Sequence, residues 1–268
     1  MAISTFAASA SALTASIWRQ APRTRLSEYV LIIHICDFIA NSRQVWDIAE
    51  RRIRHQFSGH EQDIYSLDFA SDGRTIASGS GDRTIRLWDL QEGQCILSLA
   101  IEDGVTTVAI SPNNRYVAAG SLDKSVRIWD IATGTLVERT EGEHGHKDSV
   151  YSVAFSPGGQ ELVSGSLDKT IRMWRLNNGP PGMGNGAANG SARTGDCLMT
   201  FEGHKDFVLS VALTPHGHWV MSGSKDRGVQ FWDPQTGNAQ LMLQGHKNSG
   251  EWIYIRCETA DHKANSDK

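Results

Sequence analysis

Three segments of this chain carry the same four residues at the same spacing. In each, a histidine that follows a glycine is followed by serine at +18, aspartate at +22 and tryptophan at +28. The three sets are His60, Ser78, Asp82 and Trp88; His146, Ser164, Asp168 and Trp174; and His204, Ser222, Asp226 and Trp232. The steps between Trp46, Trp88, Trp129, Trp174 and Trp232 are 42, 41, 45 and 58 residues. This spacing indicates an internal repeat, which dictates the architecture because each unit packs against its neighbours.

Within a repeat, short apolar segments alternate with turn-forming residues. Residues 150–155 and 161–164 are rich in aliphatic side chains, a Ser-Pro-Gly-Gly turn separates them, and residues 170–174 follow a second turn. Short β-branched segments between such turns are typical of an antiparallel meander. A Gly-His opening, a Trp-Asp close and a period of about 40–45 residues are typical of the four-stranded blade of a WD-repeat β-propeller. We therefore expect an all-β propeller.

The repeat pattern covers residues 45–249 and is incomplete at both ends. Residues 45–47 look like the closing strand of a blade whose earlier strands are absent, and Gly245-His246 opens a unit that has Gly250 at the expected aliphatic position. The sequence thus predicts about four full four-stranded blades with a partial blade at each end, in an open arc. Residues 1–44 are expected to be a leader that is disordered or not native-like, and 250–268 a non-repeat tail. The Gly/Asn/Pro-rich segment 177–196 predicts a flexible surface loop between two strands of one blade.

Two further hypotheses concern the ends of the pattern. Residues 1–25 are rich in Ala, Ser and Thr, contain arginine and lack acidic residues, a composition that resembles a mitochondrial transit peptide. Alternatively, both ends are translated introns, because residues 250–252 can be encoded by a splice-donor sequence and Gln44 by an acceptor.

The repeated polar residues favour a structural network over a catalytic site. The Trp indole can donate a hydrogen bond to the Ser hydroxyl, the hydroxyl can meet one His nitrogen, and the other nitrogen can reach the Asp. A hydrolase needs one such triad with an exposed serine, whereas this set occurs three times beside a tryptophan. The unit that ends at Trp129 keeps Asp123 but has Ile101 and Ala119 at the His and Ser positions, which avoids leaving one polar group buried alone.

Composition and motifs argue against several other functions. Net charge is −4, which gives no overall basic field for nucleic acid. No His, Cys or carboxylate cluster has metal-ligand spacing, and no Gly-rich phosphate loop follows a strand. The four cysteines form no paired motif, and Cys95 and Cys197 fall in equivalent strands, which favours reduced thiols and an intracellular compartment. We therefore expect no enzyme activity, no cofactor, no metal, no direct nucleic-acid partner and no membrane span.

Several segments closely resemble the Tup family of fungal general transcriptional corepressors, relatives of the Groucho corepressors. The segments are residues 58–67, 101–109, 145–153, 203–211, 223–229 and 241–249. The resemblance implies a seven-bladed domain that DNA-bound repressors hold on promoters, and hence a nuclear protein (or, alternatively, a cytoplasmic one). The helical segment that tetramerises this family has no counterpart in residues 1–44.

One rim of the central channel is the expected docking surface. The residue at +5 from each histidine position should begin the innermost strand at this rim, with polar or aromatic residues two places earlier and turn residues on the same face. These residues are Tyr65, Thr106, Tyr151 and Leu209; Asp63, Ser149 and Phe207; and Leu122, Leu167 and Lys225. Exposed aromatic and aliphatic side chains ringed by polar ones favour protein docking, although packing between blades is the alternative. The resemblance implies that repressors contact Tyr65, Tyr151, Leu209 and Asn248.

The sequence therefore predicts a protein-interaction scaffold, similar to a corepressor recruited by DNA-bound repressors. The alternative is a generic WD-repeat adaptor of another intracellular complex, such as a ubiquitin-ligase substrate receptor, in which the same rim would bind a degron.

Overall fold

The computed structural model describes residues 15–19, 29–33, 42–47, 52–140, 145–176 and 193–245. All secondary-structure elements in these ranges are β-strands. The strands form five sheets, which we call blades and number in chain order. No helix that could cross a membrane occurs in these ranges.

Each blade is an antiparallel meander, to which the third adds one short strand. The first blade contains β1 (Ala15–Arg19), β2 (Tyr29–Ile33), β3 (Ser42–Asp47) and β4 (Arg52–Ser58). The second contains β5 (Ile64–Phe69), β6 (Thr75–Ser80), β7 (Thr84–Asp89) and β8 (Gln94–Ala100). The third contains β9 (Val105–Ile110), β10 (Tyr116–Ser121), β11 (Val126–Asp130), β12 (Leu136–Thr140) and β16 (Arg193–Thr194). The fourth contains β13 (Val150–Phe155), β14 (Glu161–Ser166), β15 (Ile171–Arg175) and β17 (Asp196–Phe201). The fifth contains β18 (Val208–Leu213), β19 (Val220–Ser224), β20 (Gly228–Trp232) and β21 (Ala239–Gln244).

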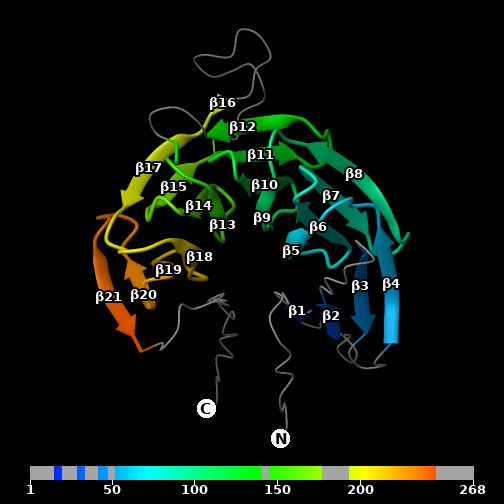
Figure 1. Cartoon of the computed structure of the whole chain (residues 1–268), viewed down its shortest axis with the longest axis horizontal. Coiled ribbons are helices and arrows are strands. Elements are labelled where there is room, and N and C mark those ends of the chain that lie inside the picture. The colour runs from blue at the N-terminus through cyan, green and yellow to red at the C-terminus, as the bar shows by residue number, and fades with distance from the viewer. Residues whose placement is uncertain are drawn as a thin grey trace, which may run out of the picture.

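The blades follow one another around an arc, with β5, β9, β13 and β18 toward its centre and β8, β12, β17 and β21 at its outer edge (Figure 1). In the described ranges no strand pairing joins the first blade to the fifth. The predicted all-β, incomplete propeller is therefore confirmed.

The strand content of residues 1–44 differs from the expectation. β1, β2 and the first residues of β3 lie in this range and pair in register with one another, so that the blade ending at β4 has four strands. The repeat landmarks begin only at Val45, whereas strands before it also occur in this structure. The physical reason is the run Tyr29–Ile33, which contains four aliphatic residues after a tyrosine and has high β-propensity although it lacks the repeat landmarks.

The predicted loop 177–196 separates two strands that pair directly. β15 and β17 are neighbours in the fourth blade, so the insertion does lie between two strands of one blade. Residues 193–194 are not loop, because they form β16, which pairs in parallel with β12 of the third blade. Residues 177–192 lie outside the described ranges. So do the opening fragment that starts at His246 and the tail 250–268.

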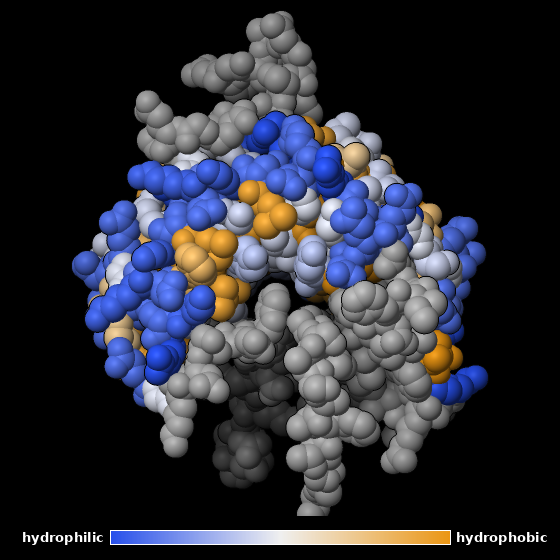
Figure 2. Space-filling model, in the orientation of Figure 1, coloured by the Kyte–Doolittle hydropathy of each residue, from blue (hydrophilic) through white to orange (hydrophobic). Residues whose placement is uncertain are grey.

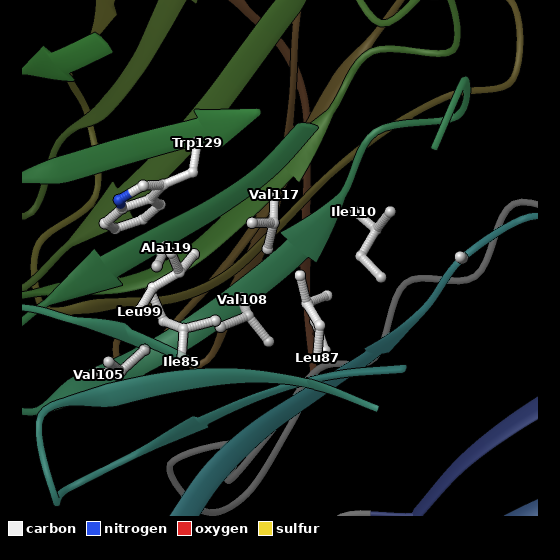
Figure 3. Close-up of a cluster of buried hydrophobic side chains, with 11 residues drawn as sticks. Ile85, Leu87, Leu99, Val105, Val108, Ile110, Val117, Ala119 and Trp129 are labelled. Carbon is white, nitrogen blue, oxygen red and sulfur yellow. The ribbon is translucent and has the colours of Figure 1, made fainter. Parts of the chain in front are cut away.

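Apolar side chains and glycines hold neighbouring blades together. Figure 3 shows side chains of the second blade meeting those of the third, among them Ile85, Leu87 and Leu99 against Val105, Val108 and Val117. Gly120 in β10 allows the next blade to approach, because a Cβ built there would lie 2.6 Å from Cγ1 of Val150. Gly79 and Gly165 hold the same position in the second and fourth blades. A Cβ built on either would lie 2.5 or 2.6 Å from a valine Cγ1 of the next blade. The core is therefore a series of interfaces between sheets.

Candidate protein-interaction site

The repeated His, Ser, Asp and Trp side chains meet in three blades. In the fourth blade His146 Nδ1 lies 2.9 Å from Asp168 Oδ2, and Nε2 lies 2.7 Å from Ser164 Oγ. The indole N–H of Trp174 donates to the same hydroxyl at 2.8 Å. Because an ionised aspartate only accepts, Nδ1 of the histidine carries the proton and Nε2 accepts from the serine. The network thus joins the loop before β13 to β14, β15 and the turn between them.

The second and fifth blades repeat these contacts. The His–Asp and His–Ser distances and the Trp–Ser hydrogen bond are 2.7, 2.7 and 2.8 Å for His60, Asp82, Ser78 and Trp88. They are 2.8, 2.7 and 2.8 Å for His204, Asp226, Ser222 and Trp232. The three serines are 0% exposed, so their hydroxyls cannot meet a substrate from solvent. This geometry suits a structural role, because each hydroxyl already serves two buried partners.

The network lowers the pKa of its three aspartates, which keeps them ionised, and it keeps His146 neutral. Burial alone would raise the pKa of Asp168, but hydrogen bonds from His146, Lys147 N–H and Thr170 bring it well below the usual value. Burial lowers the pKa of His146, although the hydrogen bond and charge of Asp168 raise it. The pair therefore holds one negative charge near neutral pH.

The third blade replaces the histidine network with an ion pair. Arg127 in β11 is buried, lies 2.6 Å from the carboxylate of Asp123 and also contacts the carboxylate of Glu102. Arg139 of β12 lies 3.2 Å from the other oxygen of Glu102. Sequence reasoning identified the missing histidine and serine but not this substitution. The signal was available, because arginine recurs two residues before the tryptophan as Arg86, Arg127 and Arg172.

A second set of contacts between blades was also missed. The third residue of each of the innermost strands β5, β9 and β13 carries a hydroxyl group. This hydroxyl accepts a hydrogen bond from a backbone N–H in the innermost strand of the next blade. The pairs are Val108 N–H to Ser66, Val153 N–H to Thr107 and Val211 N–H to Ser152, at 3.1, 3.3 and 3.0 Å. A small hydroxyl residue occupies this position, +6 from the histidine position, in all four units, with Ser210 in the last. These bonds hold the inner strands in line around the channel.

Turns at the channel rim share one backbone hydrogen bond. The carbonyl at +3 from the histidine position accepts the N–H at +21, as in Gly81 N–H to Asp63 O at 2.8 Å and Leu122 N–H to Gly104 O at 3.0 Å. The same bond joins Leu167 to Ser149 and Lys225 to Phe207, at 3.0 and 2.9 Å. The predicted rim residues therefore fall on equivalent positions of successive turns.

The rim turns of neighbouring blades touch. A Cβ built on Gly81 would lie 3.2 Å from the Tyr65 ring, and one built on Gly104 would lie 3.1 Å from Leu122 and 3.7 Å from Gly81 Cα. Tyr65 and Leu122 are 46% and 38% exposed, so two exposed apolar side chains flank the point where Gly81 and Gly104 of neighbouring blades meet. The Ser149 hydroxyl donates to Leu122 O at 3.2 Å, which extends this contact to the fourth blade. On the face drawn in Figure 2, hydrophobic side chains gather toward the centre of the arc.

Other predicted rim residues occupy different environments. Asp63 and Lys225 are exposed, whereas Ser149, Tyr151, Leu167, Phe207 and Leu209 are half-buried. The ammonium group of Lys225 lies 5.2 Å from the centre of the Phe207 ring. Asn248 lies outside the described residues.

Thr106 does not belong to an exposed surface. It is 7% exposed, and its hydroxyl contacts the carbonyl oxygens of Gly120 and Val150. Burial between blades explains why it departs from the expectation. The innermost strands also begin one residue earlier than expected, at the aliphatic residue at +4.

Comparison with known proteins identifies the repeat. The family model described as "WD domain, G-beta repeat" matches residues 51–89, 93–130, 138–175 and 195–233. The chain is 70% identical over 206 residues to the transcriptional repressor rco-1 of Neurospora crassa. This match covers 77% of this chain and 33% of the relative. It is 56% identical over 211 residues to the general transcriptional corepressor TUP1 of Saccharomyces cerevisiae, covering 77% of this chain and 29% of the relative. Identity to the transcriptional repressor tup12 of Schizosaccharomyces pombe is 55% over 200 residues, covering 75% and 32%. The chain thus spans about a third of the length of these relatives.

Proposed function

The chain belongs to the family of WD domain, G-beta repeat proteins, and on that basis we propose that it is a protein-interaction scaffold of a nuclear transcriptional corepressor. The similarity to three fungal proteins that are named as repressors or corepressors supports this function. In the proposed role, DNA-bound repressors bring the propeller to promoters through protein contacts, without a cofactor and without direct contact between this chain and DNA.

The single observation that carries the proposal is the exposure of the large apolar side chains of Tyr65 and Leu122 at the rim. Large apolar side chains exposed beside charged ones are favourable anchors for a partner, because docking removes them from water. Asp63 and Lys225 supply charges of opposite sign on the same rim, which would orient the partner. Tyr151, Phe207 and Leu209 would extend the surface across the fourth and fifth blades.

Substitution of the two rim tyrosines tests the proposal. We expect Tyr65→Ala combined with Tyr151→Ala to abolish recovery of sequence-specific DNA-binding repressors in a pulldown from fungal nuclear extract. The melting temperature should change little, because Tyr65 is exposed and Tyr151 is only half-buried. Ile96→Ala is the matched control, since Ile96 is a similarly exposed apolar residue on the outer strand β8. Undiminished repressor binding by the double variant would contradict the assignment of the rim.

A further inference from the structure

The innermost strand of each interior blade packs on the blade before it in one fixed register. Its side chains at +4, +7 and +9 from the histidine position belong to the apolar clusters that join the two blades. These side chains are Val105, Val108 and Ile110 in β9 and Val208, Val211 and Leu213 in β18. The register is therefore a property of the repeat, and it shows which residues of an innermost strand meet the preceding blade.

Two features of the preceding blade receive this strand. The glycine at +19 leaves room for the valines, since a Cβ built on Gly165 would lie 2.6 Å from Val208 Cγ1 and 2.8 Å from Val211 Cγ1. The hydroxyl at +6 accepts the N–H at +7 of the next unit, as Ser152 accepts from Val211 at 3.0 Å. A blade that carries both features on its far side is thus built to receive a further innermost strand.

The fifth blade, at one end of the described arc, carries both features (Figure 1). Gly223 in β19 stands at +19 and Ser210 in β18 at +6 from the histidine position. Trp219, at +15, is 38% exposed, whereas Tyr116 at the same position of the third blade is 5% exposed and belongs to the cluster shared with the fourth blade. The far side of the fifth blade therefore has the acceptor groups of an interior blade and an aromatic side chain left partly in water.

The linker after β21 has the length needed to reach this surface. β21 ends at Gln244, and five residues separate it from the +4 position of the unit that His246 opens. Five residues, 59–63, also join β4 to the +4 position of the second blade, where β5 begins. Because linkers of equal length between equivalent strands span equal distances, the chain from residue 250 onward can reach β18 and β19. Residues 246–268 lie outside the described ranges.

Two aliphatic residues beyond this linker fall at the required offsets. Ile253 is at +7 and Ile255 at +9 from the histidine position, whereas Gly250 stands at +4 in place of an aliphatic residue. Trp252 and Tyr254 alternate with the isoleucines. Since successive side chains of an extended segment point to opposite faces, the two isoleucines share one face and the two aromatic residues share the other.

We propose that residues 250–255 dock on the far side of the fifth blade as an added innermost strand. In this arrangement the two isoleucines pack beside Gly223 and Trp219, and the N–H of Ile253 donates to the Ser210 hydroxyl. The added strand covers β18 and β19 and leaves the outer strand β21 uncovered. The rim residues of the proposed function take no part in this contact.

Paired substitutions in the full chain test the docking by amide hydrogen exchange. Ile253→Asp combined with Ile255→Asp should speed exchange in β19 about tenfold or more, because two charges replace the apolar contact. Trp252→Asp combined with Tyr254→Asp is the matched control, since it places two charges in the same segment on the other face. The control should leave exchange in β19 unchanged. Strand β14 of the fourth blade, which β18 packs against, is the internal reference and should not change in either variant.

A variant that adds contact guards against a general loss of structure. Gly250→Val restores the aliphatic residue of the other units and should slow exchange in β19, because the valine fills the space beside Gly223. Adding Ser210→Ala should remove part of this gain, since the N–H of Ile253 then loses its acceptor.

A disulfide shows which chain supplies the segment. The distance of 2.8 Å from a Cβ on Gly165 to Val211 Cγ1 is the guide, because the equivalent pair is residues 223 and 253. Gly223→Cys with Ile253→Cys, in a chain whose four native cysteines are replaced by serine, should form a bond within one chain after mild oxidation. Gly223→Cys with Tyr254→Cys should form none, because a shift of one residue turns the side chain to the other face.

Each of four results would overturn the proposal. They are an effect of the isoleucine pair on β19 no greater than that of the aromatic pair, no slowing of exchange by Gly250→Val, no disulfide between positions 223 and 253, and a disulfide that joins two chains. The last result would mean that a second copy supplies the segment. The repressor pulldown is a separate test, because the rim substitutions do not touch this surface.

Discussion

At the scale of single residues, each buried serine of the networks bridges a histidine and a tryptophan. Ser164 meets His146 Nε2 at 2.7 Å and accepts from the Trp174 indole at 2.8 Å, with all three side chains buried. Removal of the hydroxyl would leave two buried polar groups without a partner, and each such group costs about 1–3 kcal/mol. The third blade avoids this cost because isoleucine and alanine occupy both positions together.

We therefore predict that the effects of two substitutions in the fourth blade are not additive. Ser164→Ala should lower the free energy of unfolding by about 2–4 kcal/mol, since two buried groups lose their partner. The double variant His146→Ile with Ser164→Ala should lose less than the sum of the two single changes, measured by urea unfolding in a double-mutant cycle. Ala119→Ser is the reciprocal control, and it should not stabilise the third blade, where no histidine is present. Strict additivity would show that the hydroxyl does not couple these side chains.

The half-buried carboxylate of Asp68, between the second and third blades, gives a second prediction, on pH. Burial raises the pKa of Asp68 to about 6, although the N–H groups of Ile110 and Phe69, at 2.7 and 2.9 Å, lower it. The folded state thus holds this proton more tightly than the unfolded chain, so Asp68 lowers stability most above pH 6. This loss shrinks as pH falls below 6 and disappears only below the unfolded-state pKa of 3.8. Relative to Asp68→Asn, the wild-type chain should gain about 1 kcal/mol of unfolding free energy between pH 7 and 5. The buried histidines are common to both proteins and cancel in this comparison. A pH-independent difference between the two proteins would contradict the raised pKa.

The sequence predicted side-chain contacts best where they repeat. Equal spacing in three units placed His146, Ser164 and Trp174 together, because a fixed register brings fixed offsets into contact. The ion pair of Arg127 was not predicted, since it depends on Glu102 reaching across from a loop. Burial of Thr106 also escaped prediction, because the equivalent positions hold larger and more exposed residues.

At the scale of elements, glycine sets the distance between adjacent blades. Gly120→Ala should lower the free energy of unfolding by about 1–3 kcal/mol, because the new methyl group would overlap the Val150 side chain. Adding Val150→Ala should recover part of this loss if the overlap is the cause. Gly158→Ala is the control, since no atom lies within 4 Å of a Cβ at that position. Equal effects at Gly120 and Gly158 in chemical denaturation would show that the blades do not meet as closely as the structure shows.

Strands inside the repeats were predictable from turn residues and apolar alternation, whereas strands outside them were not. β1 and β2 carry no Gly-His or Trp-Asp landmark, so the period gives no information about them. They pair because an aliphatic run beside the free edge of β3 satisfies its backbone hydrogen bonds. β16 was missed for a similar reason, because two residues within a Gly/Asn-rich segment carry no strand pattern.

At the scale of the whole molecule, the environment of one repeat position changes along the arc. Leu99 in β8 and Phe201 in β17 are 7% and 0% exposed, because the next blade covers them. Leu243 holds the same register position in β21 and is 49% exposed. Since most of the stability of a repeat comes from its neighbours, the interior blades should be held more firmly than the fifth.

We predict that amide hydrogen exchange is slowest between about Thr84 and Val220 and faster in β21. Among the described residues the fifth blade has one blade interface to break, whereas an interior blade has two. Exchange of β21 and β17, measured by mass spectrometry on the same sample, gives an internal comparison of equivalent strands. Phe201→Ala should lower the free energy of unfolding by about 3–5 kcal/mol, whereas Leu243→Ala, at the equivalent but exposed position, should cost much less. Equal protection in β17 and β21, together with equal costs of the two substitutions, would mean that the outer face of the fifth blade is covered in solution.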